Sequence, residues 1–178
     1  PRHTQDTNRA IKYEHPPKAP TGIFALRVPP HLWQQTAQRY CTPILSQPDF
    51  WSWLMDNPTV PLCITEGAKK AGALLTAGYG AIALPGIHNG YRTPKDEQGN
   101  RIGKSYLIPP LEKLAASGRE IYIVFDQDTK PNTIESVNIA IRQMGYLLTK
   151  SGCTVKIVVW DNKLGKGVDD LIAHQGSH

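Results

Sequence analysis

Cysteine is scarce in this sequence, and the few cysteines present argue against a disulfide framework. The three residues, Cys41, Cys63 and Cys153, are odd in number and form no CxxC pair, and the six histidines are scattered, which argues against a structural zinc site. No apolar run reaches the roughly 20 residues of a membrane-spanning helix. The N-terminus also lacks the apolar region of an export signal. These absences favour a protein of the reducing cytoplasm.

A strong excess of one charge is missing as well. The 178 residues carry a formal net charge of +5 and an isoelectric point near 9.2, which is compatible with a polyanionic partner but does not require one. Hydrophobic residues make up 40% and charged residues 20%, as in soluble globular proteins. This length suits one compact domain with an extended arm. Because the chain starts at Pro1 and ends in Gly-Ser-His, we expect an excised domain with a tag remnant at 176–178.

Long periodic segments are missing from residues 1–60, which are rich in proline. Only two short helices are expected there, near Pro30–Arg39 and Phe50–Asp56. We interpret this stretch as an N-terminal arm packed on the main body, because it lacks a core of its own. Three of the four tryptophans lie in it, and we expect them to pack against that body rather than to stack on bases: Trp33, Trp51 and Trp53.

From residue 61 to residue 175, short apolar strands alternate with amphipathic helices. Such alternation predicts an α/β fold with a parallel sheet of about four strands, right-handed crossovers and flanking helices. The strands are predicted at Leu62–Thr65, Ala81–Leu84, Glu120–Phe125 and Thr154–Trp160, and the helices at Ala68–Thr76, Pro109–Ala116, Thr133–Lys150 and Val168–Ala173. In the longest helix one apolar stripe at helical spacing is expected to face the core: Ile134, Val137, Ile141, Met144 and Leu148.

Acidic residues follow the predicted strands where ligands bind in open parallel sheets, at the carboxyl ends. Glu66 ends the first strand, Asp126 and Asp128 follow the third, and Asp169 and Asp170 follow the fourth. Taken singly, Glu66 could favour a helix N-terminus, and the aspartates could form an Asx turn or a helix cap. Taken together, carboxylates ending two strands of one sheet must repel each other or share a cation. Oxygen ligands of this kind suit Mg²⁺.

Two motifs make a resemblance specific. Ile64-Thr65-Glu66-Gly67 and Phe125-Asp126-Gln127-Asp128 resemble the signature of TOPRIM domains, which occur in primases, topoisomerases and related nucleases. The sequence is most similar to the TOPRIM-like domain of cyanobacterial plasmid and mobile-element replication proteins. That similarity extends over about residues 12–173 and includes Lys12–Pro16, Glu66–Ala71 and Gly165–Asp170. It implies a Rossmann-like TOPRIM core at 61–175. For Glu66 to meet Asp126 and Asp128, the first and third strands must be neighbours, which gives an expected strand order of 2-1-3-4.

The resemblance also implies roles for individual residues. Glu66 matches the family's glutamate, a general acid or base and metal neighbour, and Asp126 and Asp128 match its DxD metal ligands. Asp169 and Asp170 match a further acidic pair more loosely. Gln127 stands where many primases have a glycine inside the DxD motif. A further glycine usually follows the motif, whereas Thr129 follows it here. These departures weaken the likeness to primases in detail but leave the expected Mg²⁺ or Mn²⁺ site intact.

Basic residues near the carboxyl ends of the strands, the rim where the acidic residues gather, are candidates for binding nucleic acid. Lys69 and Lys70 open a helix, where they would contact a phosphate or lie on a solvated helical turn. The long polar connection Tyr91–Ser105 is expected to be a basic β-hairpin that lies along a DNA backbone. The basic residues assigned to nucleic-acid binding in all are Lys69, Lys70, Arg92, Lys95, Arg101, Lys104 and Lys166.

Together these features predict a metal-dependent enzyme of phosphoryl transfer on DNA in plasmid or phage replication, working with a helicase domain or protein. Primer synthesis is favoured, and nicking or topoisomerase-like cleavage is the close alternative, although no tyrosine stands out as a nucleophile. Lys69 and Lys70 join Glu66 and the DxD pair as catalytic candidates. A second alternative is a non-catalytic module that binds DNA or a helicase. A third reads Asp126 as the nucleophile of a haloacid-dehalogenase-like phosphatase.

Overall fold

The computed structural model describes residues 22–176 of the chain. Two features of the sequence lie outside the described residues, namely the segment Lys12–Pro16 and the last two residues of the expected tag remnant, Ser177 and His178. None of the helices described in 22–176 is both long and apolar enough to cross a bilayer.

A four-stranded parallel sheet forms the centre of the fold. Its order is β2-β1-β5-β6, which confirms the order expected for the four predicted strands. β1 and β2 are almost entirely buried and β5 is mostly buried, as befits strands covered on both faces, whereas the edge strand β6 is largely exposed. Their bounds are Leu62–Glu66 for β1, Ala81–Leu84 for β2, Glu120–Val124 for β5 and Thr154–Ile157 for β6.

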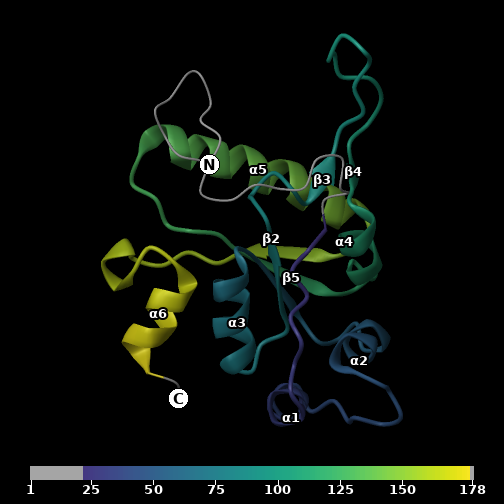
Figure 1. The fold of residues 1–178 in the computed structure, drawn as a ribbon, viewed down its shortest axis with the longest axis vertical. Coiled ribbons are helices and arrows are strands. Elements are labelled where there is room, and N and C mark those ends of the chain that lie inside the picture. The colour runs from purple at the N-terminus through teal and green to yellow at the C-terminus, as the bar shows by residue number, and fades with distance from the viewer. Residues whose placement is uncertain (1–21, 177–178) are drawn as a thin grey trace, which may run out of the picture.

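Helices cover the two faces of the sheet. The helices α3 (Ala68–Thr76) and α6 (Val168–Gln175) pack against each other on one face. The long helix α5 (Pro131–Lys150) lies on the opposite side of the central strands (Figure 1). The short helix α4 (Pro109–Leu114) shares that side, because its Leu111 and Met144 of α5 both lie beside Gly90. The steps from β1 to β2 and from β5 to β6 run in opposite directions across the sheet, so their connecting helices lie on opposite faces, as expected for right-handed crossovers.

The described part of the N-terminal stretch adds its own side chains to the core. Helices α1 (Pro30–Arg39) and α2 (Phe50–Asp56) form as predicted, and Trp53 is fully buried in the main hydrophobic cluster. The indole nitrogen of Trp51 donates a hydrogen bond of 2.9 Å to the carbonyl of Leu26. The prediction that the tryptophans pack against the body is confirmed, since Trp33 and Trp51 also lie against this cluster.

One buried cation ties α2 to the sheet. Arg119, directly before β5, has no exposed surface and donates hydrogen bonds of 2.7 Å to the carbonyl of Leu54 and 2.6 Å to that of Val60. Phe24 meanwhile forms an antiparallel bridge with Ala83 and so covers the outer edge of β2. Among residues 22–176, no strand pairs with the outer edge of β6.

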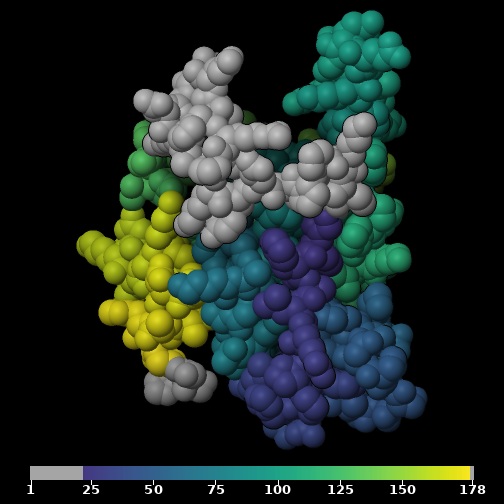
Figure 2. Space-filling model, viewed as in Figure 1, coloured from purple at the N-terminus to yellow at the C-terminus, as the bar shows by residue number. Residues whose placement is uncertain are grey.

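A hairpin projects from the body. Strands β3 (Tyr91–Arg92) and β4 (Tyr106–Leu107) pair antiparallel, and Lys95 pairs with Arg101 further out. Figures 1 and 2 show this segment extending away from the helices and the sheet. The connection 91–105 is therefore a basic β-hairpin, as predicted.

Two apolar predictions differ from the structure in the same region. The stripe of α5 was expected to face the core along its whole length, yet only Met144 and Leu148 are fully buried, and Ile134 is 41% exposed. The last strand was expected to reach Trp160 but ends at Ile157. Ile157 is 54% exposed and Val159 is 73% exposed. Helical and strand periodicity identify an apolar face but not whether another element covers it.

Candidate functional site

The ends of β1 and β5 bring the two predicted motifs together. These strands are parallel neighbours in the register Thr65 with Val124, so Glu66 and Asp126 emerge at the same rim of the sheet. Gly67 follows Glu66 with φ +84°, a backbone conformation that side-chain-bearing residues rarely adopt. That turn starts α3 directly above the rim. The chain passes from β1 outward to β2 on one side of this pair and from β5 outward to β6 on the other. The two carboxylates therefore lie at the point where strand order reverses, the usual place for ligands.

Lys70 supplies the cation that the two strand ends share. Its Nζ lies 2.9 Å from Oδ1 of Asp126 and donates hydrogen bonds of 3.1 Å to Oδ2 and 3.3 Å to the carbonyl of Glu66. Both side chains of the pair are mostly buried, at 20% exposure for Lys70 and 23% for Asp126. The expected repulsion between carboxylates is therefore offset by an ammonium group of the chain itself.

Asp128 has a lysine partner of its own. Nζ of Lys166 lies 2.5 Å from its Oδ2, and its Oδ1 accepts a hydrogen bond of 3.0 Å from the backbone nitrogen of Lys130. The second contact is the Asx turn that the sequence allowed for this motif. The Lys166 hydrogen bond, helped by that backbone donor, holds the pKa of Asp128 below its usual value, and Asp128 in turn raises the pKa of Lys166. The backbone carbonyl of Lys166 also accepts a hydrogen bond from Gln127.

The two aspartates of α6 take different roles. Oδ2 of Asp169 lies 2.9 Å from Nζ of Lys69, whose side chain is 85% exposed. Asp170 caps its own helix by accepting a hydrogen bond of 3.2 Å from the backbone nitrogen of Gly167. A Cβ at Gly167 would lie 2.9 Å from Cε of Lys70 and closer still to Asp169, so glycine permits the start of α6 to approach the rim.

Glu66 differs electrostatically from the paired aspartates. Burial raises the pKa of its carboxyl, and the negative charge of Asp126 adds to that effect. Lys70 and Lys166 act in the opposite direction without cancelling it. A carboxyl group whose pKa is raised in this way is suited to exchanging a proton closer to neutral pH.

The oxygen donors at the rim fit a hard divalent cation in chemistry. Oδ1 of Asp169 is shielded from solvent and accepts no hydrogen bond within 22–176, and the shielded Oδ1 of Asp126 has the Lys70 ammonium as its ion-pair partner. In that part of the chain, no three acidic, histidine or cysteine side chains are grouped closely enough to enclose a metal ion. Mg²⁺ is commonly held by only one or two carboxylates together with substrate phosphates. A divalent cation at this rim would therefore need water or substrate phosphates to complete its coordination.

The basic hairpin is not joined to this rim. Between its basic side chains and the rim carboxylates, residues 22–176 contain no ion pair or hydrogen bond. The guanidinium of Arg92 donates instead to the carbonyl of Tyr91. The expected nucleic-acid residues therefore fall into two groups. One group forms ion pairs with the carboxylates of the rim: Lys69, Lys70 and Lys166. The other group belongs to the hairpin: Arg92, Lys95, Arg101 and Lys104.

An apolar groove beside the rim was not anticipated from the sequence. It has a volume of about 510 Å³ and extends from the DxD segment between α5 and the end of β6. Its residues are Phe125, Asp126, Gln127, Asp128, Ile134, Val137, Asn138, Ile141, Ile157, Val158 and Val159. The signal that could have located it is the apolar stripe of α5, which continues to Ile134 beyond the part of the helix that β6 covers.

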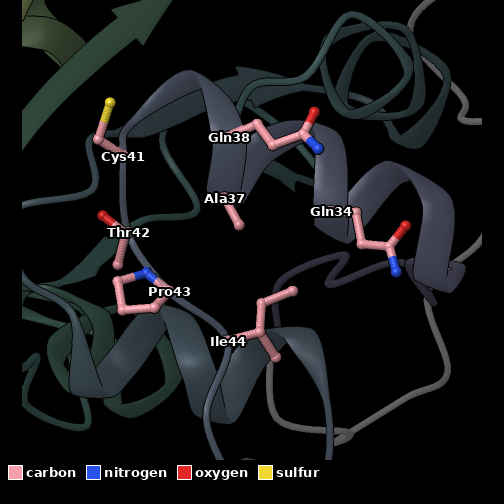
Figure 3. A pocket seen from close by; sticks show the side chains of 7 residues that line it. All are labelled: Gln34, Ala37, Gln38, Cys41, Thr42, Pro43 and Ile44. Atoms are coloured by element: carbon pink, nitrogen blue, oxygen red, sulfur yellow. The ribbon is translucent and has the colours of Figure 1, made fainter.

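A second cavity lies elsewhere in the fold. It has a volume of about 500 Å³. Figure 3 shows its lining residues on α1 and on the segment that follows it. Its polar groups are amides, a hydroxyl and the thiol of Cys41, and no carboxylate or lysine lines it. It has no residue in common with the rim and offers no acid–base pair.

Comparison with known proteins places the domain in a family. Residues 50–178 match the family described as a domain of unknown function, DUF3854. The chain belongs to the DUF3854 family. It is 49% identical over 179 aligned positions to an uncharacterized protein of Picosynechococcus sp. (strain ATCC 27264 / PCC 7002 / PR-6). The match covers 99% of this chain but only 18% of that relative, so the chain spans about a fifth of the curated protein. No solved structure matches significantly.

The DUF3854 region contains the whole acidic rim. It begins at Phe50, the first residue of α2, and includes Glu66, Asp126, Asp128 and the start of α6. The buried residues of α2 and the sheet that carries the rim thus belong to one family region.

Proposed function

We propose that this DUF3854 domain performs metal-dependent phosphoryl transfer on DNA in plasmid or phage replication. Primer synthesis is the favoured reaction, and strand nicking is the alternative. The proposal rests on the TOPRIM-like motifs and on one observation. Glu66 and Asp126 emerge from neighbouring parallel strands where strand order reverses, with Lys70 between them. The net positive charge agrees with a nucleic-acid partner.

The rim would hold Mg²⁺ or Mn²⁺ through Asp126 and Asp128, with Glu66 beside them and the α6 pair, Asp169 and Asp170, as outer members. A divalent cation bound there would supply charge stabilisation for the attacking and leaving oxygens of a phosphodiester. Such an ion would give the shielded Oδ1 of Asp169 a partner and would replace the Lys70 ammonium at Oδ1 of Asp126.

The chain's own side chains would then divide the remaining work. Glu66, with its raised pKa, accepts the proton of the attacking hydroxyl or water. Lys70 and Lys166, once released from Asp126 and Asp128, become free to contact phosphate oxygens. The exposed Lys69 lies on the same side and adds to the positive field that orients the substrate.

The second candidate function is a non-catalytic module that binds DNA or a helicase. The observation that favours it is that lysines already pair with the aspartates of the rim. Asp126, Asp128 and Asp169 each have an ammonium partner within the chain, so these three carboxylates are paired without metal. The part of the relative beyond this domain leaves ample room for a helicase.

The candidates are separated by one pair of assays. The protein is incubated with Mn²⁺ and either supercoiled plasmid or single-stranded template with nucleotides. Short oligonucleotide products support primer synthesis, nicked circles support cleavage, and neither product supports the binding module. Asp126→Asn should abolish the product, whereas Asp56→Asn, a change at an exposed residue of α2, should leave it unchanged.

A further inference from the structure

The groove between α5 and β6 is an apolar surface that the fold leaves uncovered. Ile134 on α5 and Ile157 and Val159 on the β6 side are 41%, 54% and 73% exposed. All three line the same space of about 510 Å³. Exposing side chains of this size forgoes the stabilisation that burial would provide, about 25 cal/mol for each Å² of apolar surface. Several large apolar residues gathered at a concave site commonly mark a ligand surface.

One end of the groove is the acidic rim. Its lining there consists of Asp126, Gln127 and Asp128. Lys70 forms an ion pair with Asp126, and Lys166 forms one with Asp128. A ligand here would therefore meet charged groups at one end and hydrocarbon walls at the other. The volume suits a small molecule rather than a folded partner.

We propose that the groove holds the base of a free nucleoside triphosphate whose phosphates lie at the acidic rim. This inference rests on the proposed function and names the substrate class of that site. Charge complementarity supports it. A nucleobase is planar and uncharged and suits the walls of Ile134, Ile157 and Val159. The triphosphate is anionic and suits Lys70, Lys166 and a divalent cation held by the aspartates.

Asn138 gives the groove a polar group at its apolar end. It lies one helical turn from Ile134 on α5 and lines the same space. A primary amide offers one acceptor and two donors, which can pair with the edge of a base. Aliphatic walls contact the face of any base alike, so Asn138 is the residue that would introduce a preference among bases.

The test is calorimetric titration in Mn²⁺ with three probes: ATP, inorganic tripolyphosphate and a short single-stranded oligo(dA). The wild type should bind ATP about tenfold or more tighter than tripolyphosphate, the gain expected from burying one base against apolar side chains. Ile134→Ser/Val159→Ser should lose most of that advantage and still bind tripolyphosphate like the wild type. Both changes affect partly exposed side chains, so the fold should persist. Leu45→Ser, at a residue 76% exposed and outside the groove, is the matched control and should behave like the wild type.

Each other outcome overturns the proposal in a recognisable way. Equal affinity for ATP and tripolyphosphate, or an unchanged ATP affinity in the double variant, removes the base site and leaves the metal and phosphate site standing. If the double variant binds oligo(dA) more weakly than the wild type but binds ATP equally well, the groove is a site for single-stranded DNA. Dimerisation in sedimentation that the double variant abolishes would assign it to a second copy of the chain. Failure of tripolyphosphate to bind would overturn the proposed function as well.

Discussion

Nζ of Lys70 donates a hydrogen bond of 3.1 Å to Oδ2 of Asp126 and thereby joins the first turn of α3 to the end of β5. The same ammonium contacts the carbonyl of Glu66 at the end of β1. It therefore occupies the position between two strand ends where a shared cation is expected. We propose that the ammonium group of Lys70 occupies the metal position until metal and phosphate bind.

Replacing Lys70 separates these two roles. Lys70→Met should lower the free energy of unfolding of the metal-free protein by about 1–3 kcal/mol, because Asp126 is left mostly buried without its partner. The same variant should bind Mn²⁺ more tightly, since no ammonium competes for Asp126. Denaturant unfolding and calorimetry measure the two effects. Lys69→Met, at an 85% exposed lysine, is the control and should change both much less. Equal behaviour of the two variants would contradict the role given to Lys70.

Glu66 should make the stability of the metal-free protein depend on pH. Burial raises its pKa in the folded state above the ordinary value of 4.5. Its contribution to stability is then fully present below the unfolded pKa and is lost as pH rises through the folded pKa. Glu66→Gln should therefore raise the melting temperature at neutral and alkaline pH, and this gain should vanish in acid. Thermal melts across pH test it against Glu97→Gln on the exposed hairpin. A constant gain at every pH would disprove the titration of Glu66 as its cause.

Arg119 should be important for stability but not for chemistry. Arg119→Met would leave the carbonyls of Leu54 and Val60 without their buried donor, at a cost of about 3 kcal/mol in unfolding free energy. Arg142→Met, at an exposed position of α5, should cost little. Urea denaturation of both variants gives the comparison. A cost for Arg119→Met no larger than that for Arg142→Met would show that its hydrogen bonds contribute nothing net.

The hairpin should bind DNA through phosphates alone. Replacing Lys95 and Arg101 by alanine should weaken binding and reduce the slope of log K against log salt by about 0.9 for each lost contact. The slope is obtained from fluorescence anisotropy at several salt concentrations. Lys113→Ala/Lys150→Ala removes the same charge from α4 and α5 and serves as the control. An unchanged slope in the hairpin variant would exclude this segment from the interface.

Much of the fold could be predicted because its signals are local. Proline and glycine positions bound the helices, and apolar runs such as Leu62–Thr65 mark strands buried on both faces. The strand order followed from requiring Glu66 and Asp126 to meet, and the observed sheet has that order. The α/β architecture was confirmed, whereas the TOPRIM identity remains a proposal supported by motif and geometry.

What the sequence could not reveal is how side chains choose partners across the fold. Nothing in the chain indicates that Lys70 would pair with a residue 56 positions away, or Lys166 with Asp128. The stripe of α5 likewise predicts an apolar face at Ile134 but not the end of β6 that leaves it uncovered. Arg119 gave no sequence signal because an arginine is rarely buried completely. Pairing and coverage depend on tertiary distances, which periodicity does not contain.

The central claim is that the rim of Glu66, Asp126 and Asp128 binds a divalent cation. Calorimetric titration of Mn²⁺ into the wild type and into Asp126→Asn tests it most directly, with Asp56→Asn as the control for loss of one negative charge. We expect saturable binding by the wild type and the control, and an affinity about tenfold or more weaker in Asp126→Asn. Equal Mn²⁺ binding by all three proteins, or no binding by the wild type, would contradict it.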